Sequence, residues 1–345
     1  MRRIVQILIL LNFIAADAHT QSFTVDELAK LTNLPLKNIG HYMNKKGFVL
    51  SDKASDSAEI KATFIQKFRF RKETDPKRSI DIFLREGIKH FTLHTTDFTE
   101  YQQGIQKLIK SGFFYDTLKD VTKGGSVLFQ KANINIQGAA KMQDSSWQCS
   151  LILIEKAIPA TLRYADDLLH FDSHAFLSSY FGKENVKRDI FYFEEKEFKR
   201  CSVLFGGTQR QAVFVWEDSI YLNKLLYILV TNKLPTEAGL KSNPLAGNNL
   251  WRLKSGVYVG MELKELLKIN EVDFDIYGNK SEMAFLIQPN SYGKIDFKKT
   301  AVMLSCNDCD DHKIFNQRLV SALDVAKAKL QLRVLDIALY PEARH

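Results

Sequence analysis

The sequence predicts an α+β fold, with tandem units of short helices packed on antiparallel sheets. Short runs such as residues 134–137 alternate apolar and polar side chains, which is typical of strands with one buried face. Two stretches, beginning near Thr24 and near Asp97, start with a helix-capping pattern and end at a glycine followed by phenylalanine. Apolar residues make up 45% of the chain and charged residues 26%, a composition that argues against disorder.

Residues 1–18 have the pattern of an export signal. Arg2 and Arg3 supply positive charge, residues 4–14 form an apolar run, and residues 16–18 give a small-x-small cleavage pattern. A membrane-spanning helix needs about 20 residues, and this apolar run is shorter. We therefore expect an exported mature protein, periplasmic or extracellular, with no transmembrane segment.

Residues 19–157 are predicted to hold two helix-on-sheet, repeat-like units, at about 19–95 and 96–157. In the first, Thr24 and Glu27 fit a capping box, and Gly47 is placed to end the helical part. In the second, Asp97 begins the helix and Gly112 follows it. The expected strands are residues 64–70, 80–84 and 89–93 in the first unit. In the second they are 127–136, either continuous or broken near residue 131, and 148–154.

Residues 158–345 are predicted to form a C-terminal α+β domain, after a joint at 158–161 that contains a proline. A helix is expected at 172–181, helix or strand at 222–230, and a loop at 236–249. The stretch 251–278 turns from a strand at 257–259 through the corner Gly260-Met261 into a short helix, because glycine tolerates the tight turn. Further strands are expected at 190–193, 201–205, 212–216, 272–277, 284–287, 293–297, 301–304 and 330–340, with a loop and short helix at 315–327.

The same stretch carries a motif formed by Trp251, Gly256, Val257, Gly260, Met261, Leu263, Glu265 and Leu266. It resembles the W-x4-G-[VI]-x2-G-[MT]-x-L-x-E-L segment of uncharacterised exported proteins of Bacteroidetes type. These proteins also have an apolar strand that closes on W-x-D, here Val213, Val215, Trp216 and Asp218. A weaker likeness is to the SmpA/OmlA lipoproteins and the β-lactamase inhibitor protein. The resemblance implies a fold of short helices on antiparallel sheet and an exported location, but no activity.

His170, Asp172 and His174 form the most suggestive polar cluster. On a strand, alternate side chains share a face, so the three could converge on a metal ion. They also precede a predicted helix, for which Asp172 or Ser173 is a suitable N-cap. A solvated capping loop is the favoured interpretation. The alternative is a metal site or a hydrolase centre, with Cys201 as a thiol nucleophile and one of the histidines as its base.

Cys306 and Cys309 have the C-x-x-C spacing of a local disulfide, a redox pair or half of a zinc site. The adjacent Asp310 and Asp311 would raise a thiol pKa, which disfavours a redox thiolate. His312 alone does not complete a zinc site. Because disulfides are permitted in an exported chain, a disulfide-closed loop is the leading interpretation.

The strongest basic and aromatic run is Phe68-Arg69-Phe70-Arg71-Lys72, followed by Lys77 and Arg78. On a strand the phenylalanines would point inward and the arginines outward, so a half-buried strand is favoured over a nucleic-acid surface. The net charge of +8 is scattered along the chain. We expect no nucleic-acid partner, no cofactor and no bound metal.

The sequence therefore predicts an exported, non-enzymatic protein that acts by surface contact with an envelope protein or a surface polymer. A metal-dependent or thiol hydrolase that uses His170, Asp172 and His174 is the alternative.

Overall fold

A computed structural model describes residues 24–55, 59–67, 77–85, 88–116, 125–194, 197–236, 239–242, 249–306, 309 and 312–343. The expected export signal and the Phe68–Lys72 run lie outside the described residues. The chain divides into two compact units, Met1–Ala157 and Ile158–His345. This boundary falls at the joint expected from the sequence. Within the described residues, none of the helices combines the length and the apolar character that a membrane crossing requires.

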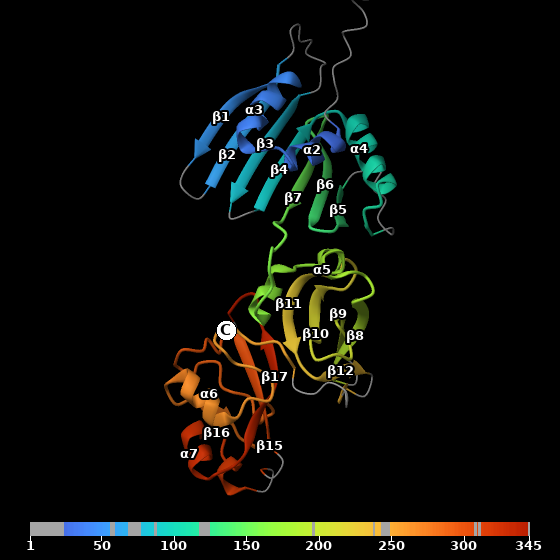
Figure 1. The fold of residues 1–345 in the computed structure, drawn as a ribbon. Helices are drawn as coiled ribbons and strands as arrows, with labels where there is room; N and C mark the ends of the chain where they lie inside the picture. Colours follow the sequence, from blue (N-terminus) through green and yellow to red (C-terminus); the bar gives the residue numbers. More distant parts are fainter. Residues whose placement is uncertain are drawn as a thin grey trace, which may run out of the picture. The chain divides into compact units, whose positions relative to one another are not determined.

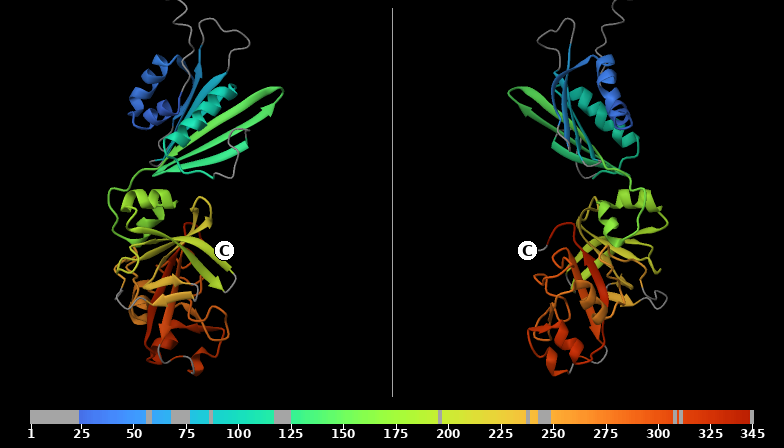
Figure 2. Two further views of the ribbon diagram at one scale, coloured as in Figure 1. Left: turned by 90° about the vertical axis from the view of Figure 1, so that its right-hand side faces the viewer. Right: turned by 60° about the vertical axis from the view of Figure 1, so that its left-hand side comes forward.

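The fold is α+β, and its N-terminal unit is built on one antiparallel sheet of seven strands in the order β1-β2-β3-β4-β7-β6-β5. Helices α2 (Val25–Thr32), α3 (Leu36–Lys45) and α4 (Phe98–Lys110) lie on the same side of the sheet (Figures 1 and 2). The strands are β1 (Phe48–Ser55), β2 (Glu59–Gln66), β3 (Arg78–Arg85), β4 (Ile88–Thr95), β5 (Gly125–Lys131), β6 (Ile134–Gln143) and β7 (Ser146–Glu155).

Local signals place the helix ends of this unit as the sequence predicts. The Thr24 N–H donates to Glu27 Oε2 at 2.7 Å, and Asp97 accepts from the Glu100 N–H at 3.1 Å. After α3 and α4 the chain turns at Gly47 (φ +80°) and Gly112 (φ +75°), a conformation that favours glycine. The helical part of the first half consists of two helices, α2 and α3.

The two predicted repeat-like units share one sheet and one core. Strand β4, at the end of the first half, pairs with β7 of the second half. Leu28 from α2 and Leu108 from α4 belong to the same buried cluster. The first half also contains strand β1, which the sequence analysis did not predict, and the predicted break near residue 131 is the turn between β5 and β6.

Alternation along each strand separates two faces of this sheet. Phe64, Ile80, Phe91, Ile136 and Leu153 are buried with the helices in one core. The residues between them point to the opposite side, because successive side chains alternate across a strand.

Gly138 shows how closely α4 packs on the helix-bearing face. A Cβ at this position would lie 2.9 Å from both Ile105 Cδ1 and the Tyr101 hydroxyl oxygen. A Cβ at this point of β6 would force these two side chains to shift, so the sheet and α4 pack closely here.

The C-terminal unit has a six-stranded antiparallel sheet in the order β15-β17-β11-β10-β9-β8. Its strands are β8 (Val186–Glu194), β9 (Glu197–Leu204), β10 (Ala212–Asp218), β11 (Asn223–Val230), β15 (Thr300–Cys306) and β17 (Leu332–Leu339). Two-stranded pairs are formed by β12 (Lys233–Thr236) with β13 (Gly239–Ser242), and by β14 (Asp275–Tyr277) with β16 (Leu319–Ser321). The helical elements are η2 (Ala165–His170), α5 (His174–Phe181), α6 (Leu263–Asn270), η3 (Lys313–Phe315) and α7 (Ala322–Lys327).

The Gly-Met corner is hydrogen-bonded to β17, and this contact places the apolar side chains of the motif in the core. The Gly260 N–H donates to the Val334 carbonyl at 2.7 Å, and the Val334 N–H donates to the Met261 carbonyl at 2.8 Å. Gly256 and Gly260 both have a φ of +93°. Buried in the large core cluster are Trp251, Met261, Leu263 and Leu266. The motif thus has a structural role, as the sequence suggested.

Three segments expected to be strands, 257–259, 284–287 and 293–297, are not strands. Residues 257–259 lie between two glycines with positive φ, which bend the chain on both sides. The segment therefore forms a single isolated bridge, between Arg252 and Tyr258. Phe285 has a φ of +65°, so 284–287 cannot stay extended. Segment 293–297 instead lies beside the C-terminal end of α6, where Asn270 Oδ1 accepts a hydrogen bond from the Ile295 N–H at 3.1 Å.

Of two other segments, one fits the expectation and one differs from it. The apolar run 222–230, which was compatible with helix or strand, is strand β11. The expected loop at 236–249 includes part of the β12–β13 hairpin.

Candidate functional site

The structure does not bring His170, Asp172 and His174 together as a metal site. His170 ends η2 and is exposed, whereas His174 is the first residue of α5. Ser173 caps α5, and its side chain accepts from the Phe176 N–H at 3.3 Å. Within the described residues, no three side chains of histidine, cysteine, aspartate or glutamate are grouped so as to hold a metal ion. The segment is therefore a helix-capping turn.

His174 is a structural histidine that faces the core. Its Nδ1 lies 2.9 Å from Ser202 Oγ, and its Nε2 lies 3.2 Å from Ser178 Oγ. Ser202 Oγ also accepts from the Trp216 indole N–H at 2.8 Å. Burial, with the positive charge of Arg188, lowers the His174 pKa from 6.5 to about 4. The imidazole is thus neutral at neutral pH, and Ser202 is fully buried, so the pair cannot reach a substrate.

Cys201 and His174 lie on opposite sides of the C-terminal sheet. Ser202, the partner of His174, points to the side of Trp216 and the large core cluster. Cys201 is the preceding residue on β9 and packs in a separate cluster with Val203, Val213 and Val215. Burial raises the Cys201 pKa to about 12, and Asp189 adds to this shift. The thiol nucleophile of the alternative hypothesis has neither its base nor access to solvent.

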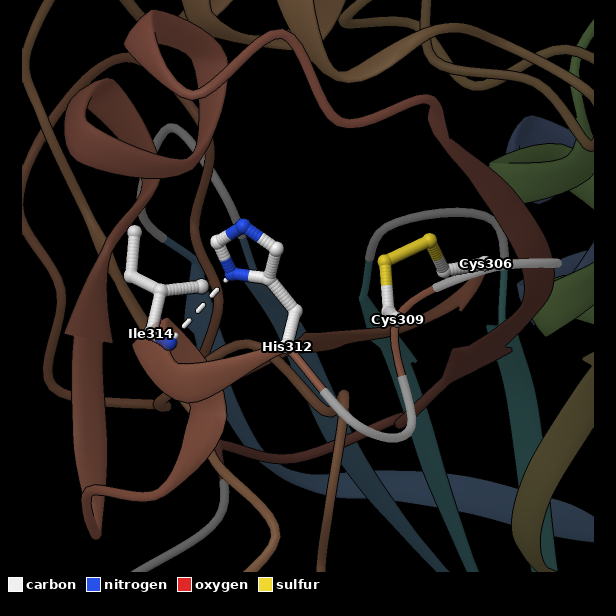
Figure 3. Close-up of a disulfide and its surroundings, with 4 residues drawn as sticks. All are labelled: Cys306, Cys309, His312 and Ile314. Atoms are coloured by element: carbon white, nitrogen blue, oxygen red, sulfur yellow. Dashed lines mark hydrogen bonds between the residues drawn. A yellow bond between two sulfur atoms is a disulfide. The ribbon is translucent and has the colours of Figure 1, made fainter.

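Cys306 and Cys309 are joined by a disulfide (Figure 3). Their Cα atoms lie 5.6 Å apart, within the range of ordinary disulfides. His312 points away from the sulfur atoms, and its Nδ1 accepts from the Ile314 N–H at 3.3 Å at the start of η3. The predicted cysteine pair thus closes a short loop after β15, and His312 is a helix cap.

Arg78, which the sequence analysis assigned to a basic and aromatic run, is buried. Its Nε donates to Glu100 Oε2 at 2.7 Å, and its Nη1 donates to Gln66 Oε1 at 3.1 Å. The side chain is 3% exposed. It therefore does not contribute to a basic surface.

The structure instead offers a broad polar surface, the side of the N-terminal sheet opposite α2, α3 and α4, which we call the helix-free face. The strand registers place its side chains in three rows across the sheet. The first row is Lys61, Phe83, His90, Ile154, Asn135 and Gln130. The second is Thr63, Asp81, Thr92, Ile152, Gln137 and Leu128, and the third is Ile65, Ser79, His94, Ser150, Ala139 and Ser126.

The first row contains polar atoms that are shielded from solvent and have no hydrogen-bond partner. These are His90 Nε2, Asn135 Oδ1 and both amide atoms of the Gln130 side chain. The row orders them as His90, Ile154, Asn135 and Gln130 on four neighbouring strands. Burial lowers the His90 pKa, which favours the neutral imidazole.

An acidic residue organises the next two rows. Asp81 Oδ1 accepts from the Thr63 hydroxyl at 2.8 Å, and Asp81 Oδ2 lies 3.0 Å from His94 Nε2. The histidine and the hydroxyl both contact the carboxylate and not each other. His94 therefore does not act as a base on Thr63, and the trio lacks the arrangement of an activated nucleophile.

A shallow groove of about 470 Å³ runs along the third row. Among its lining residues are His94, Ser126, Ala139, Gln148 and Ser150. Hydroxyl, amide and imidazole groups thus stand beside small apolar side chains. This mixture of groups can form hydrogen bonds with another surface and also pack against its apolar side chains.

Part of this face could have been found from the sequence. The alternation at 134–137 already places Asn135 and Gln137 on the polar side of a strand, and His90 falls in an expected strand. The neighbours of these residues depend on strand pairing, which the sequence analysis did not derive. The sequence therefore contains no pattern that would predict which of these polar atoms have no hydrogen-bond partner.

No protein-family model matches the chain, and neither do curated proteins or solved structures. The resemblance to exported Bacteroidetes-type proteins stays a prediction.

Proposed function

We propose that this is an exported, non-enzymatic protein that uses the helix-free face to contact an envelope protein or a surface polymer. The observation that carries the proposal is the asymmetry of the N-terminal sheet. One face is covered by α2, α3 and α4 (Figure 2), whereas the other bears rows of polar side chains, among them Thr92, His94 and Gln137, that no helix of the described chain covers. The exposed side chains of His94 and Gln137 on this face offer imidazole and amide groups that can hydrogen-bond a partner, directly or through water.

The size and composition of the face suit a contact surface. The seven strands, spaced about 4.8 Å apart, span about 29 Å, and a strand of eight residues is about 27 Å long. The resulting area, about 800 Å², equals the share of one partner in a standard interface. Ile65 is 43% exposed, and Phe83, Ile152 and Ile154 are half-buried beside the polar groups. Their further burial would add hydrophobic stabilisation.

Binding by the mature protein, residues 19–345, tests the proposal. The protein is immobilised and incubated separately with solubilised envelope proteins and with purified surface polymer from the source cells. The variant Thr92→Arg places a long cation in the middle of the helix-free face. The control Gln106→Arg adds the same charge at an exposed position of α4.

We expect the wild type and Gln106→Arg to retain the same species, and Thr92→Arg to lose it while its circular dichroism spectrum is unchanged. Equal retention by all three proteins, or no retention by the wild type, would contradict the proposal. Which of the two fractions binds decides between envelope protein and polymer.

The export component has its own test. Fractionation of cells that produce the full chain should place it outside the cytoplasm, shortened by the 18 residues of the predicted signal. A chain that stays cytoplasmic at full length would refute export.

A further inference from the structure

A second hollow lies on the other side of the same sheet, between α3 and strands β1, β2 and β3. Its volume is about 400 Å³, and most of its lining is apolar. Ile60, Phe64, Ile82 and Leu84 form the floor, and Ile39 of α3 contributes a wall. We call this hollow the α3 groove.

A glycine keeps the α3 groove open. Gly40 lies in the interior of α3, where glycine costs about 1 kcal/mol relative to alanine. It lines the groove, and a Cβ built on it would meet no atom within 4 Å. Space next to a helix is therefore preserved where a helix-favouring side chain would have filled it.

The polar residues that line the α3 groove are basic or neutral. Lys37 and Lys53 are exposed, and the remaining polar lining residue is Asn44. Among the described residues, neither lysine has an ion-pair partner, and none of the residues that line the groove is acidic. The groove thus combines an apolar floor with two positive charges that have no counter-ion among the described residues.

We propose that the α3 groove binds one long-chain fatty acid, with the acyl chain on the apolar floor and the carboxylate between Lys37 and Lys53. Its volume is near the lower end of the range of small-ligand sites, about 300–1,000 Å³, which suits one acyl chain rather than the two chains of a phospholipid. The two lysines match an anionic head group and disfavour a cationic one. This proposal is independent of any contact made by the helix-free face.

A titration of the mature protein with a series of saturated fatty acids tests the apolar part. Each buried CH₂ contributes about 0.8 kcal/mol, so the affinity should rise about fourfold per added carbon until the groove is filled, and then level off. Binding should saturate at one molecule per protein. Non-saturating binding, or affinity that is independent of chain length, would overturn the proposal.

Head-group analogues test the basic part. The alcohol of the same chain length should bind more weakly than the acid, and the alkylamine weakest of all. In the variant Lys37→Gln/Lys53→Gln the acid should lose affinity to the level of the alcohol, while the alcohol is unaffected. Equal binding of acid, alcohol and amine to the wild type would contradict a carboxylate site. A two-chain phospholipid that binds more tightly than every fatty acid would assign the groove to a membrane lipid and refute the proposal.

The variant Gly40→Leu tests the location. Leucine has a higher helix propensity than glycine, so α3 should be retained, while the side chain occupies part of the groove. We expect the affinity for the longest acid to fall at least tenfold without loss of thermal stability. Gly40→Ala is the matched control, because it improves helix propensity but adds only one methyl group. A Gly40→Leu protein that is folded and binds as tightly as Gly40→Ala would overturn the assignment.

Discussion

Arg78 on β3 donates a hydrogen bond from Nε to Glu100 Oε2 on α4 at 2.7 Å, and the side chains are 3% and 8% exposed. Glu100 Oε2 also accepts from the Thr95 hydroxyl at 2.8 Å. The pair connects the first half of the N-terminal unit to the helix of the second half. It fixes α4 on the sheet at the point where the sequence suggested a boundary between units.

Removal of one partner of this pair should destabilise the N-terminal unit strongly. In Glu100→Ala the buried guanidinium of Arg78 loses its hydrogen-bonded carboxylate and keeps only the more exposed Asp97, 3.8 Å away, so the loss should approach the about 3–5 kcal/mol of a broken buried pair. Urea unfolding followed by far-UV circular dichroism measures it. The double variant Arg78→Met/Glu100→Leu should lose much less, because no charge is left buried. If the double variant lost as much stability as the single variants Arg78→Met and Glu100→Leu added together, the pair would contribute no coupling.

Local structure was predictable here and long-range pairing was not. The capping patterns at Thr24 and Asp97 act within one helical turn, so the sequence alone indicates them. Arg78 looked like a surface residue because its partner Glu100 is 22 positions away. Strand β1 was missed because Ser51, Asp52 and Lys53 interrupt its apolar pattern, and its pairing with β2 contains a register shift there.

The candidate site follows the same rule. Alternation shows that Asn135 points away from the core, but only the strand order β4-β7-β6-β5 brings it into one row with His90 and Gln130. His170, Asp172 and His174 alternate in sequence, yet η2 ends and α5 begins between them, so their side chains do not share a face.

Reduction of the Cys306–Cys309 disulfide should have a small effect on stability. The two cysteines are three positions apart, and the loop-entropy relation gives about 2 kcal/mol for so short a loop. We expect the free energy of unfolding of the C-terminal unit, measured with urea, to fall by no more than this amount when dithiothreitol is present. The variant Cys306→Ala/Cys309→Ala should be insensitive to the reductant. Unfolding of the reduced protein in buffer alone would contradict the estimate.

The two remaining cysteines should be unreactive in the native protein. Cys149 and Cys201 are buried, and burial raises their pKa values to about 11 and about 12, so the thiolate is scarce at pH 8. An aromatic disulfide reagent at pH 8 should detect almost no thiol in the folded protein. In urea it should detect Cys149 and Cys201, and after prior reduction also Cys306 and Cys309. Rapid labelling of the native protein would show that one of the buried thiols is accessible.

His174 should make the C-terminal unit less stable in mild acid. Its pKa is about 4 in the folded protein and 6.5 as its ordinary value, because burial disfavours the imidazolium. Between pH 6.5 and 4 the unfolded chain therefore binds a proton that the folded chain does not. The contribution of the neutral His174 to stability is fully present above pH 6.5. Between pH 6.5 and pH 4 the free energy of unfolding decreases by about 1.4 kcal/mol per pH unit, by about 3 kcal/mol in total.

The variant His174→Gln isolates this contribution from the other titrating groups. Glutamine retains hydrogen-bonding capacity toward Ser202 and Ser178 but does not titrate. The variant should be less stable than the wild type at pH 7.5, because the fit of the imidazole is lost. The difference between the two proteins should then shrink by about 2 kcal/mol by pH 5, since only the wild type pays for keeping this histidine neutral. Urea unfolding at both pH values measures it, and a difference that stays constant would show that His174 protonates as readily in the folded protein as in the unfolded chain.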